Sequence, residues 1–125
     1  MPYDNSEQTV YLTDLDSLTP LGRTLKRGGS AIDGTTLTLQ TKLVKASTDA
    51  VIHDWTTTGA SWTTAASGKA QYDWQSADLT SFQAADDGDE YWFWFRVYVT
   101  GASPAEYDTF PHDGRKLKIV VKKAA

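Results

Sequence analysis

The residues of this chain with the most versatile side-chain chemistry are its two histidines, and neither stands in a recognisable site. His53 and His112 each lie in or beside a predicted turn, far apart in the sequence. A catalytic or metal-binding histidine needs further ligands or an orienting group at fixed spacing, which the sequence does not provide. We therefore interpret both as turn or surface residues, and we expect no catalytic residue and no metal site.

A cluster of carboxylates precedes the most aromatic part of the chain and consists of Asp86, Asp87, Asp89 and Glu90. Carboxylate oxygens are ligands that Ca²⁺ prefers, but the known calcium loop has a regular D-x-D-x-D-G spacing that is absent here. We favour a solvated turn before a strand, with Ca²⁺ binding as the alternative. The motifs of serine hydrolases, P-loop proteins and zinc proteases are also missing. We therefore predict a protein that is not an enzyme and uses no cofactor.

The strongest chemical signal is the segment from residue 90 to 99, which reads E-Y-W-F-W-F-R-V-Y-V. Successive side chains of a strand point to opposite faces, so this segment has two distinct sides. One side, which suits a core, consists of Tyr91, Phe93, Phe95, Val97 and Val99. The other side consists of Trp92, Trp94, Arg96 and Tyr98, where a solvent-facing strand normally carries small polar or charged residues.

Three interpretations of that second side stay open. It can be a protein interface, because Trp, Tyr and Arg carry much of the binding energy in such contacts. It can be a sugar-stacking platform, since Trp92 and Trp94 stand roughly 7 Å apart on one face of a strand. It can also be covered by the N-terminal arm of the same chain, residues 1–8. We favour an interface formed by Trp92, Trp94, Arg96 and Tyr98.

Alternating apolar and polar residues predict short strands separated by turns along the rest of the chain. We expect strands at residues 9–13, 23–27, 36–45, 51–52, 69–74, 90–99, 106–110 and 115–123, with a helical turn within 76–84. Residues 53–67, which include Trp55 and Trp62, read as a weak strand with loops. About seven short strands without a long helix predict an all-β, immunoglobulin-like antiparallel β-sandwich. This single domain, residues 9–125, follows an arm at residues 1–8.

Composition excludes several classes of protein. The net charge of −4 and the pI of about 5.0 argue against nucleic-acid binding. The chain has no cysteine, so disulfides and thiol chemistry are excluded. No apolar run approaches the roughly 20 residues of a membrane helix, and the first residues lack the basic and apolar regions of a signal peptide. We expect neither nucleic acid nor a membrane among its partners.

From Gly68 onward the order of residues becomes specific. A Tyr-x-Trp strand precedes an Ala-Asp pair, an alternating Phe-Val strand, and a Phe-Pro-x-Asp-Gly turn into the last strand. The matching residues are Tyr72, Trp74, Ala77, Asp78, Tyr91, Phe95, Val97, Phe110, Pro111, Asp113 and Gly114. This order resembles the immunoglobulin-like N-terminal domain of the siphophage baseplate upper protein family. The chain departs from that family at Trp92 and Trp94, where the family is usually polar.

The resemblance implies a non-enzymatic structural component of a tailed-phage virion. The component would belong to the baseplate or tail, or would decorate the head. Its partners would be other virion proteins, with the chain itself a homo-oligomer or present in many copies. Its location would be the virion, assembled in the host cytoplasm. The alternative function is a carbohydrate-binding module that uses Trp92 and Trp94, with host-surface carbohydrate as its ligand.

Overall fold

The computed structural model of the chain describes residues 9–13, 20–27, 29–101, 107–111 and 116–123. The expected arm at residues 1–8 lies outside the described residues, and so does His112 with the rest of the turn at 112–115. The elements are β1 (Thr9–Thr13), β2 (Leu21–Thr24), β3 (Lys26–Arg27), β4 (Ser30–Ala31), β5 (Leu37–Lys45), β6 (Ala50–Thr56), β7 (Ala60–Thr64), a 3-10 turn (Ala65–Ser67), β8 (Lys69–Tyr72), α1 (Ser76–Ala84), β9 (Glu90–Val99), β10 (Asp108–Phe110) and β11 (Leu117–Lys122).

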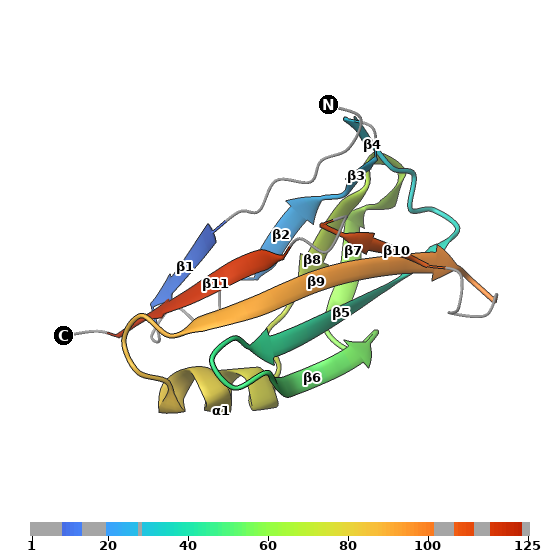
Figure 1. The fold of residues 1–125 in the computed structure, drawn as a ribbon. Coiled ribbons are helices and arrows are strands. Elements are labelled where there is room, and N and C mark those ends of the chain that lie inside the picture. The colour runs from blue at the N-terminus through green and yellow to red at the C-terminus, as the bar shows by residue number, and fades with distance from the viewer. Residues whose placement is uncertain (1–8, 14–19, 28, 102–106, 112–115, 124–125) are drawn as a thin grey trace.

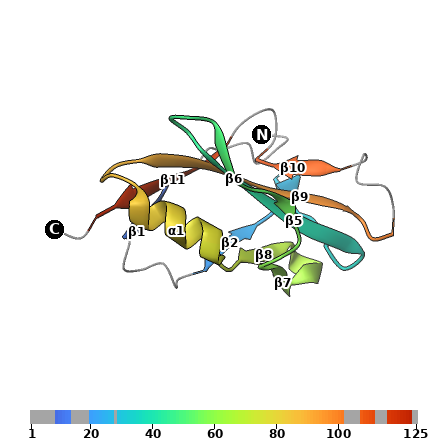
Figure 2. The same ribbon diagram turned by 90° about the horizontal axis from the view of Figure 1, so that it is seen from below.

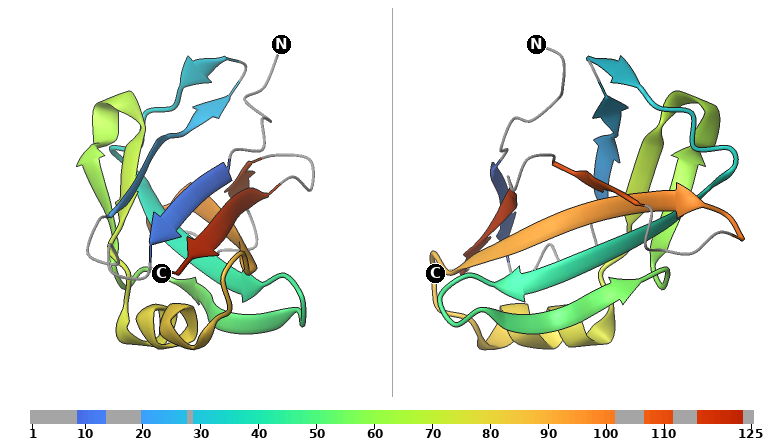
Figure 3. Two further views of the ribbon diagram at one scale, coloured as in Figure 1. Left: turned by 90° about the vertical axis from the view of Figure 1, so that its left-hand side faces the viewer. Right: turned by 45° about the vertical axis from the view of Figure 1, so that its right-hand side comes forward.

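The strands form two main sheets that pack as layers (Figure 1, Figure 3). The front sheet has the order β1-β11-β9-β5-β6, with β10 also paired to β9, and the back sheet has the order β2-β8-β7. The expected all-β sandwich is therefore confirmed. This strand order is that of a variable-type immunoglobulin sandwich, in which strands G, F, C and C′ face strands B, E and D. One pair departs from the antiparallel expectation, because β1 runs parallel to β11.

The central strand, β9, has the bounds that its alternating sequence predicts. It pairs with β5 along its length, from Leu37 opposite Val99 to Lys45 opposite Tyr91. Phe93 and Phe95 are buried as expected, because they face the back sheet. The alternation predicts that Val99 shares this core face, but Val99 is 56% exposed. It stands at the end of the strand, where it lines a pocket instead of the core.

The core between the sheets contains a cluster of aromatic rings. Its rings pack mostly edge to face, with centroids 4.9–5.9 Å apart, in a cluster of Tyr72, Trp74, Phe82, Tyr91, Phe93 and Phe95. Such pairs add to the hydrophobic gain from burial. The inward residues expected on β11, Leu117, Ile119 and Val121, are also buried. Alternation thus identified the core-facing residues of β9 and β11 correctly, apart from Val99.

The helix α1 lies beside β6 at one end of the sandwich (Figure 2). It begins after Gln75, and Asp78 accepts a hydrogen bond from the Gln75 backbone N–H at 2.9 Å in a capping box. The hydroxyl of Tyr91 donates to the carbonyl of Ser81 at 3.1 Å. This bond ties α1 to the start of β9, as the tyrosine corner does in immunoglobulin-type domains.

The segment at residues 53–67 is more regular than the sequence suggested. It contains the end of β6 and all of β7. Its threonines suit a pleated surface, and Trp62 anchors it by donating from Nε1 to the Leu37 carbonyl at 3.1 Å. His53, expected in or beside a turn, is therefore a strand residue of β6, with its ring directed to the interior.

Candidate functional site

The four residues expected to form an interface lie together on the side of the front sheet that points away from the back sheet, which we call the outer face. Trp92, Trp94, Arg96 and Tyr98 alternate with the buried residues of β9 and are each half-buried. The register with β5 places Lys42 opposite Trp94 and Gln40 opposite Arg96. The structure thus brings the predicted residues together and surrounds them with polar neighbours.

Arg96 is the most constrained cation of the outer face. Its guanidinium carbon lies 4.4 Å from the ring centroid of Trp55 and 4.5 Å from that of Tyr107. Its Nε–H donates to the side-chain oxygen of Gln40 at 2.6 Å. A guanidinium this close to two aromatic rings is held by cation–π attraction to both. Trp55 and Tyr107 are therefore part of this site, although no pattern in the sequence indicates that they meet Arg96.

Trp92 is approached by two lysines, one on the neighbouring strand β11 and one directly before it. The ammonium nitrogen of Lys116 lies 4.8 Å from the Trp92 ring centroid, and that of Lys118 lies 5.9 Å away. Lys118 also approaches the Glu90 carboxylate at 3.9 Å. A platform that stacks sugar rings needs an uncovered aromatic face, so Trp92 does not present one in this arrangement.

Cations dominate the outer face. Among the described residues they are Lys42, Arg96, Lys116, Lys118 and Lys122, against the carboxylates Asp54 and Glu90. The chain as a whole has a net charge of −4, so this face differs in sign from the rest of the surface. Such a face attracts acidic partners and repels a copy of itself.

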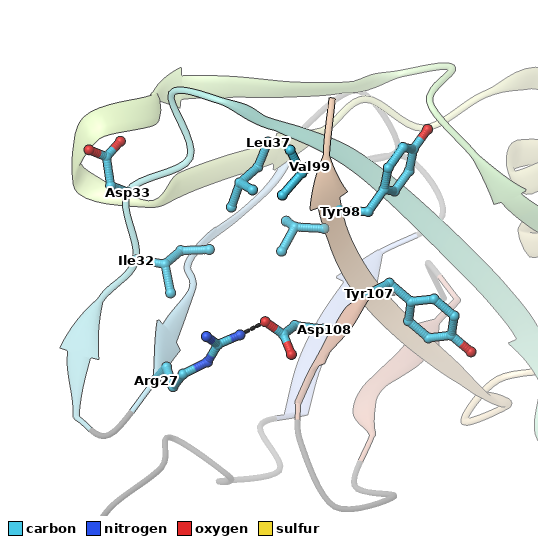
Figure 4. Close-up of a pocket in the computed structure, with 9 residues that line it drawn as sticks. Arg27, Ile32, Asp33, Leu37, Tyr98, Val99, Tyr107 and Asp108 are labelled. Atoms are coloured by element: carbon cyan, nitrogen blue, oxygen red, sulfur yellow. Dashed lines mark ion pairs between the residues drawn. The ribbon is translucent and has the colours of Figure 1, made fainter. Parts of the chain in front are cut away.

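A pocket of about 630 Å³ adjoins the outer face at the end of β9 (Figure 4). It has apolar walls that include Ile32, Leu37 and Val99, and an ion pair between Arg27 and Asp108 crosses one side. Tyr98 lines it at the border with the outer face, with its hydroxyl directed away from the pocket. Its volume lies within the range of small-molecule sites.

A second constellation is buried between the sheets and α1. His53 Nδ1 lies 2.7 Å from Asp78 Oδ1, and His53 Nε2 lies 2.9 Å from the hydroxyl of Thr41. The Tyr72 hydroxyl donates to the other oxygen of Asp78. Burial, followed by this hydrogen bond and the nearby Asp78 charge, raises the pKa of Tyr72 far above its usual range. The sequence patterns do not predict this network, because its members come from four separate elements: β5, β6, β8 and α1.

The order Thr41, His53, Asp78 matches that of a nucleophile, a general base and an orienting carboxylate. The Thr41 side chain is fully buried, however, so a substrate cannot reach its hydroxyl. Asp78 also accepts hydrogen bonds from the Tyr72 hydroxyl and the Gln75 backbone N–H, so both of its buried oxygens have partners within the fold. We assign this network a structural role.

The remaining expectations concern metals and membranes. In the part of the chain that the structure describes, which includes Asp86 to Glu90, no three histidine or carboxylate side chains gather closely enough to hold a metal ion. None of the described helical segments has the length and apolar character needed to span a membrane. Comparison with known proteins gives no relative, since no protein-family model matches the chain and no curated protein is significantly similar to it.

Proposed function

We propose that this chain is a non-enzymatic structural subunit of a tailed-phage virion, in the tail or baseplate or as a head decoration protein. It works through protein–protein contacts made by the outer face and is located in the virion. The order of residues from Gly68 onward supports this, through its resemblance to the baseplate upper protein family. The immunoglobulin-type sandwich is the fold that this resemblance leads one to expect.

The observation that carries the proposal is the composition of the outer face. Trp92, Trp94, Arg96 and Tyr98 are residue types that dominate the energetic centres of protein interfaces. Exposed aromatic rings flank them, since Tyr107 is 47% exposed and Tyr11 is 65% exposed. A surface of this kind on a small domain usually marks a contact with another protein.

The alternative, a carbohydrate-binding module, has weaker support. Lys116 and Lys118 lie over the ring of Trp92, and Arg96 lies over Trp55. A sugar ring would have to displace these cations before it could stack. Displacement would also give up cation–π attraction, which is worth roughly 0.5–2 kcal/mol per contact.

Incorporation into particles tests the proposal. Mass spectrometry of purified particles of the phage that encodes the chain should detect the wild-type protein. A variant with Trp92→Thr and Trp94→Thr should be made and folded but missing from those particles, because both anchors are removed. The matched control is Lys69→Thr with Gln71→Thr, two residues equally spaced on β8 of the back sheet. Normal incorporation of the tryptophan variant, or absence of the wild-type chain from particles, would refute the proposal.

A further inference from the structure

Arg96 is ordered in the isolated domain, before any partner is present. The ring centroids of Trp55 and Tyr107 lie 4.4 and 4.5 Å from its guanidinium carbon, and Gln40 accepts from Nε at 2.6 Å. Only the terminal Nη1 and Nη2 groups remain to meet a partner. Because the side chain is already fixed, binding at this edge costs less conformational entropy than binding by a free arginine.

The Nη1 and Nη2 edge of the Arg96 guanidinium has the geometry of an anion receptor. Two parallel N–H groups of a guanidinium match the two oxygens of a carboxylate in a bidentate contact. Of the ion pairs among described residues, Lys42 has Asp54 at 3.8 Å and Lys118 has Glu90 at 3.9 Å, but none involves Arg96. The guanidinium edge of Arg96 thus has no carboxylate partner in the described part of the chain. The lysines of the outer face surround it with positive charge, which favours an anionic ligand.

We infer that Arg96 binds a carboxylate of the acidic turn, Asp86 to Asp89, of a second copy of this chain. The inference rests on the proposed function, in which the outer face is an interface, and it names the occupant of that face. Complementary charge supports it, because a cationic face and an exposed acidic turn occur on the same molecule. Such patterns steer association and fix its register.

The acidic turn is displayed in a form that suits this contact. Asp86 and Asp87 are exposed, and a Cβ placed on Gly88 would meet no atom within 4 Å, so the turn projects into solvent. Asp89 is engaged with Lys45 at 3.5 Å, and Asp87 accepts from the Lys123 backbone N–H at 3.0 Å. The carboxylate of Asp86 has no such partner among the described residues, which makes it the best-placed ligand for Arg96.

The contact has to form between copies, and it is heterologous. Arg96 lies six residues along β9 from Glu90, roughly 20 Å in a strand, so a chain cannot bring its own turn to its own Arg96. Two outer faces placed against each other would oppose like charges. A reciprocal pair of face-to-turn contacts would bring the two like-charged faces together, so only one such contact forms in each pair. Each pair then has one face and one turn unused, and further copies add to form rings or filaments.

Sedimentation velocity on the whole chain tests the inference. The wild type should associate with increasing concentration and dissociate as salt screens the contact. Arg96→Gln and the double variant Asp86→Asn, Asp87→Asn should each weaken association by at least about tenfold. The control is Asp73→Asn, which changes an exposed carboxylate away from the turn. Circular dichroism and thermal melting establish that each variant is folded.

Mixing the two neutralised variants distinguishes this geometry from others. Arg96→Gln alone and Asp86→Asn with Asp87→Asn alone should be mainly monomeric where the wild type associates, but their mixture should form heterodimers. The first variant retains the acidic turn and the second retains Arg96, so one face-to-turn contact forms between them and cannot propagate. A wild type that stays monomeric, variants that associate like the wild type, or a mixture without heterodimers would overturn the inference. If Arg96→Gln enters particles normally while the Trp92, Trp94 double variant does not, this inference fails and the proposed function stands.

Discussion

Nδ1 of His53 lies 2.7 Å from Oδ1 of Asp78, and this contact joins the front sheet to α1. Tyr72 brings the back sheet into the same network through its hydroxyl, which donates to Asp78. A single buried carboxylate therefore links both sheets and α1. A buried carboxylate stabilises the fold only while its donors stay in place. A carboxylate without donors, or a donor without its acceptor, is left unpaired away from water and carries a desolvation cost.

Removal of this carboxylate should be strongly destabilising. In Asp78→Ala, His53, Tyr72 and the Gln75 backbone lose their common acceptor, and the capping box of α1 is lost with it. We expect the free energy of unfolding to fall by about 3–5 kcal/mol, as when one member of a buried pair is removed. Urea denaturation measures the change. Asp73→Ala, at an exposed position nearby, is the control and should change stability by no more than about 0.5 kcal/mol.

The same network predicts a loss of stability in alkali. Burial and the bond to Asp78 raise the pKa of Tyr72 in the folded state. Above its ordinary pKa of about 10, Tyr72 ionises in the unfolded chain but stays protonated in the folded one. The folded state then holds the extra proton, so stability is complete below about pH 10 and decreases as the pH rises, by about 1.4 kcal/mol per unit.

Tyr72→Phe provides the comparison that isolates this effect. The variant loses the hydroxyl and its hydrogen bond, so it should be less stable at neutral pH. Its stability should then decrease less steeply than that of the wild type between about pH 10 and 11, because the Tyr72 hydroxyl with its raised pKa is gone. Denaturant titrations at several pH values measure both slopes. Equal slopes would show that Tyr72 titrates normally in the folded protein.

Much of the fold could be predicted because its determinants are local. Period-two alternation predicted the bounds of β9 and, within a residue, those of β5. The expected helical turn within residues 76–84 was placed correctly but underestimated, because the helix α1 fills the whole segment. The same alternation placed Trp92 and Arg96 on one side of a strand. These features depend on neighbouring residues, so a single sequence is enough to find them.

The contacts that define the sites are not local, and the sequence alone did not reveal them. Trp55 and Tyr107 reach Arg96 only because β6 pairs with β5 and β10 pairs with β9. His53 joins Asp78 across 25 residues of sequence, from a segment whose threonines and glycine made its strand hard to recognise. The pairing register of the strands determines which of these distant residues come into contact, and this register cannot be read from the composition of the segments.

The inward and outward sides of the front sheet should differ sharply in their sensitivity to substitution. Phe95 is buried against Phe93 at a centroid distance of 5.0 Å, so Phe95→Ala should cost about 3–5 kcal/mol through lost burial and a cavity. Lys118→Thr removes a partly exposed ion pair with Glu90 and should cost less than about 1 kcal/mol. Thermal melting compares them. Equal melting temperatures would mean that the sidedness of the sheet is wrong.

The most informative variant is Trp92→Thr with Trp94→Thr, because it separates the three interpretations of the outer face. Threonine suits an exposed strand position, so an interface predicts a folded, soluble monomer that fails to associate or to enter particles. We expect the variant to stay folded with a moderately lower melting temperature, because the half-buried area of both rings and the lysine contacts to Trp92 are lost. Thermal melting and sedimentation velocity measure the two properties.

The other interpretations predict different results for the same protein. If the rings fill a seam beneath residues 1–8, the variant should melt at a much lower temperature or aggregate, because buried aromatic area is lost. If they stack on sugars, the variant should assemble normally and lose binding to polysaccharide in a pull-down assay. The control is again Lys69→Thr with Gln71→Thr on the back sheet, which all three interpretations expect to be neutral. A stable variant that still associates normally would exclude the tryptophans as interface anchors.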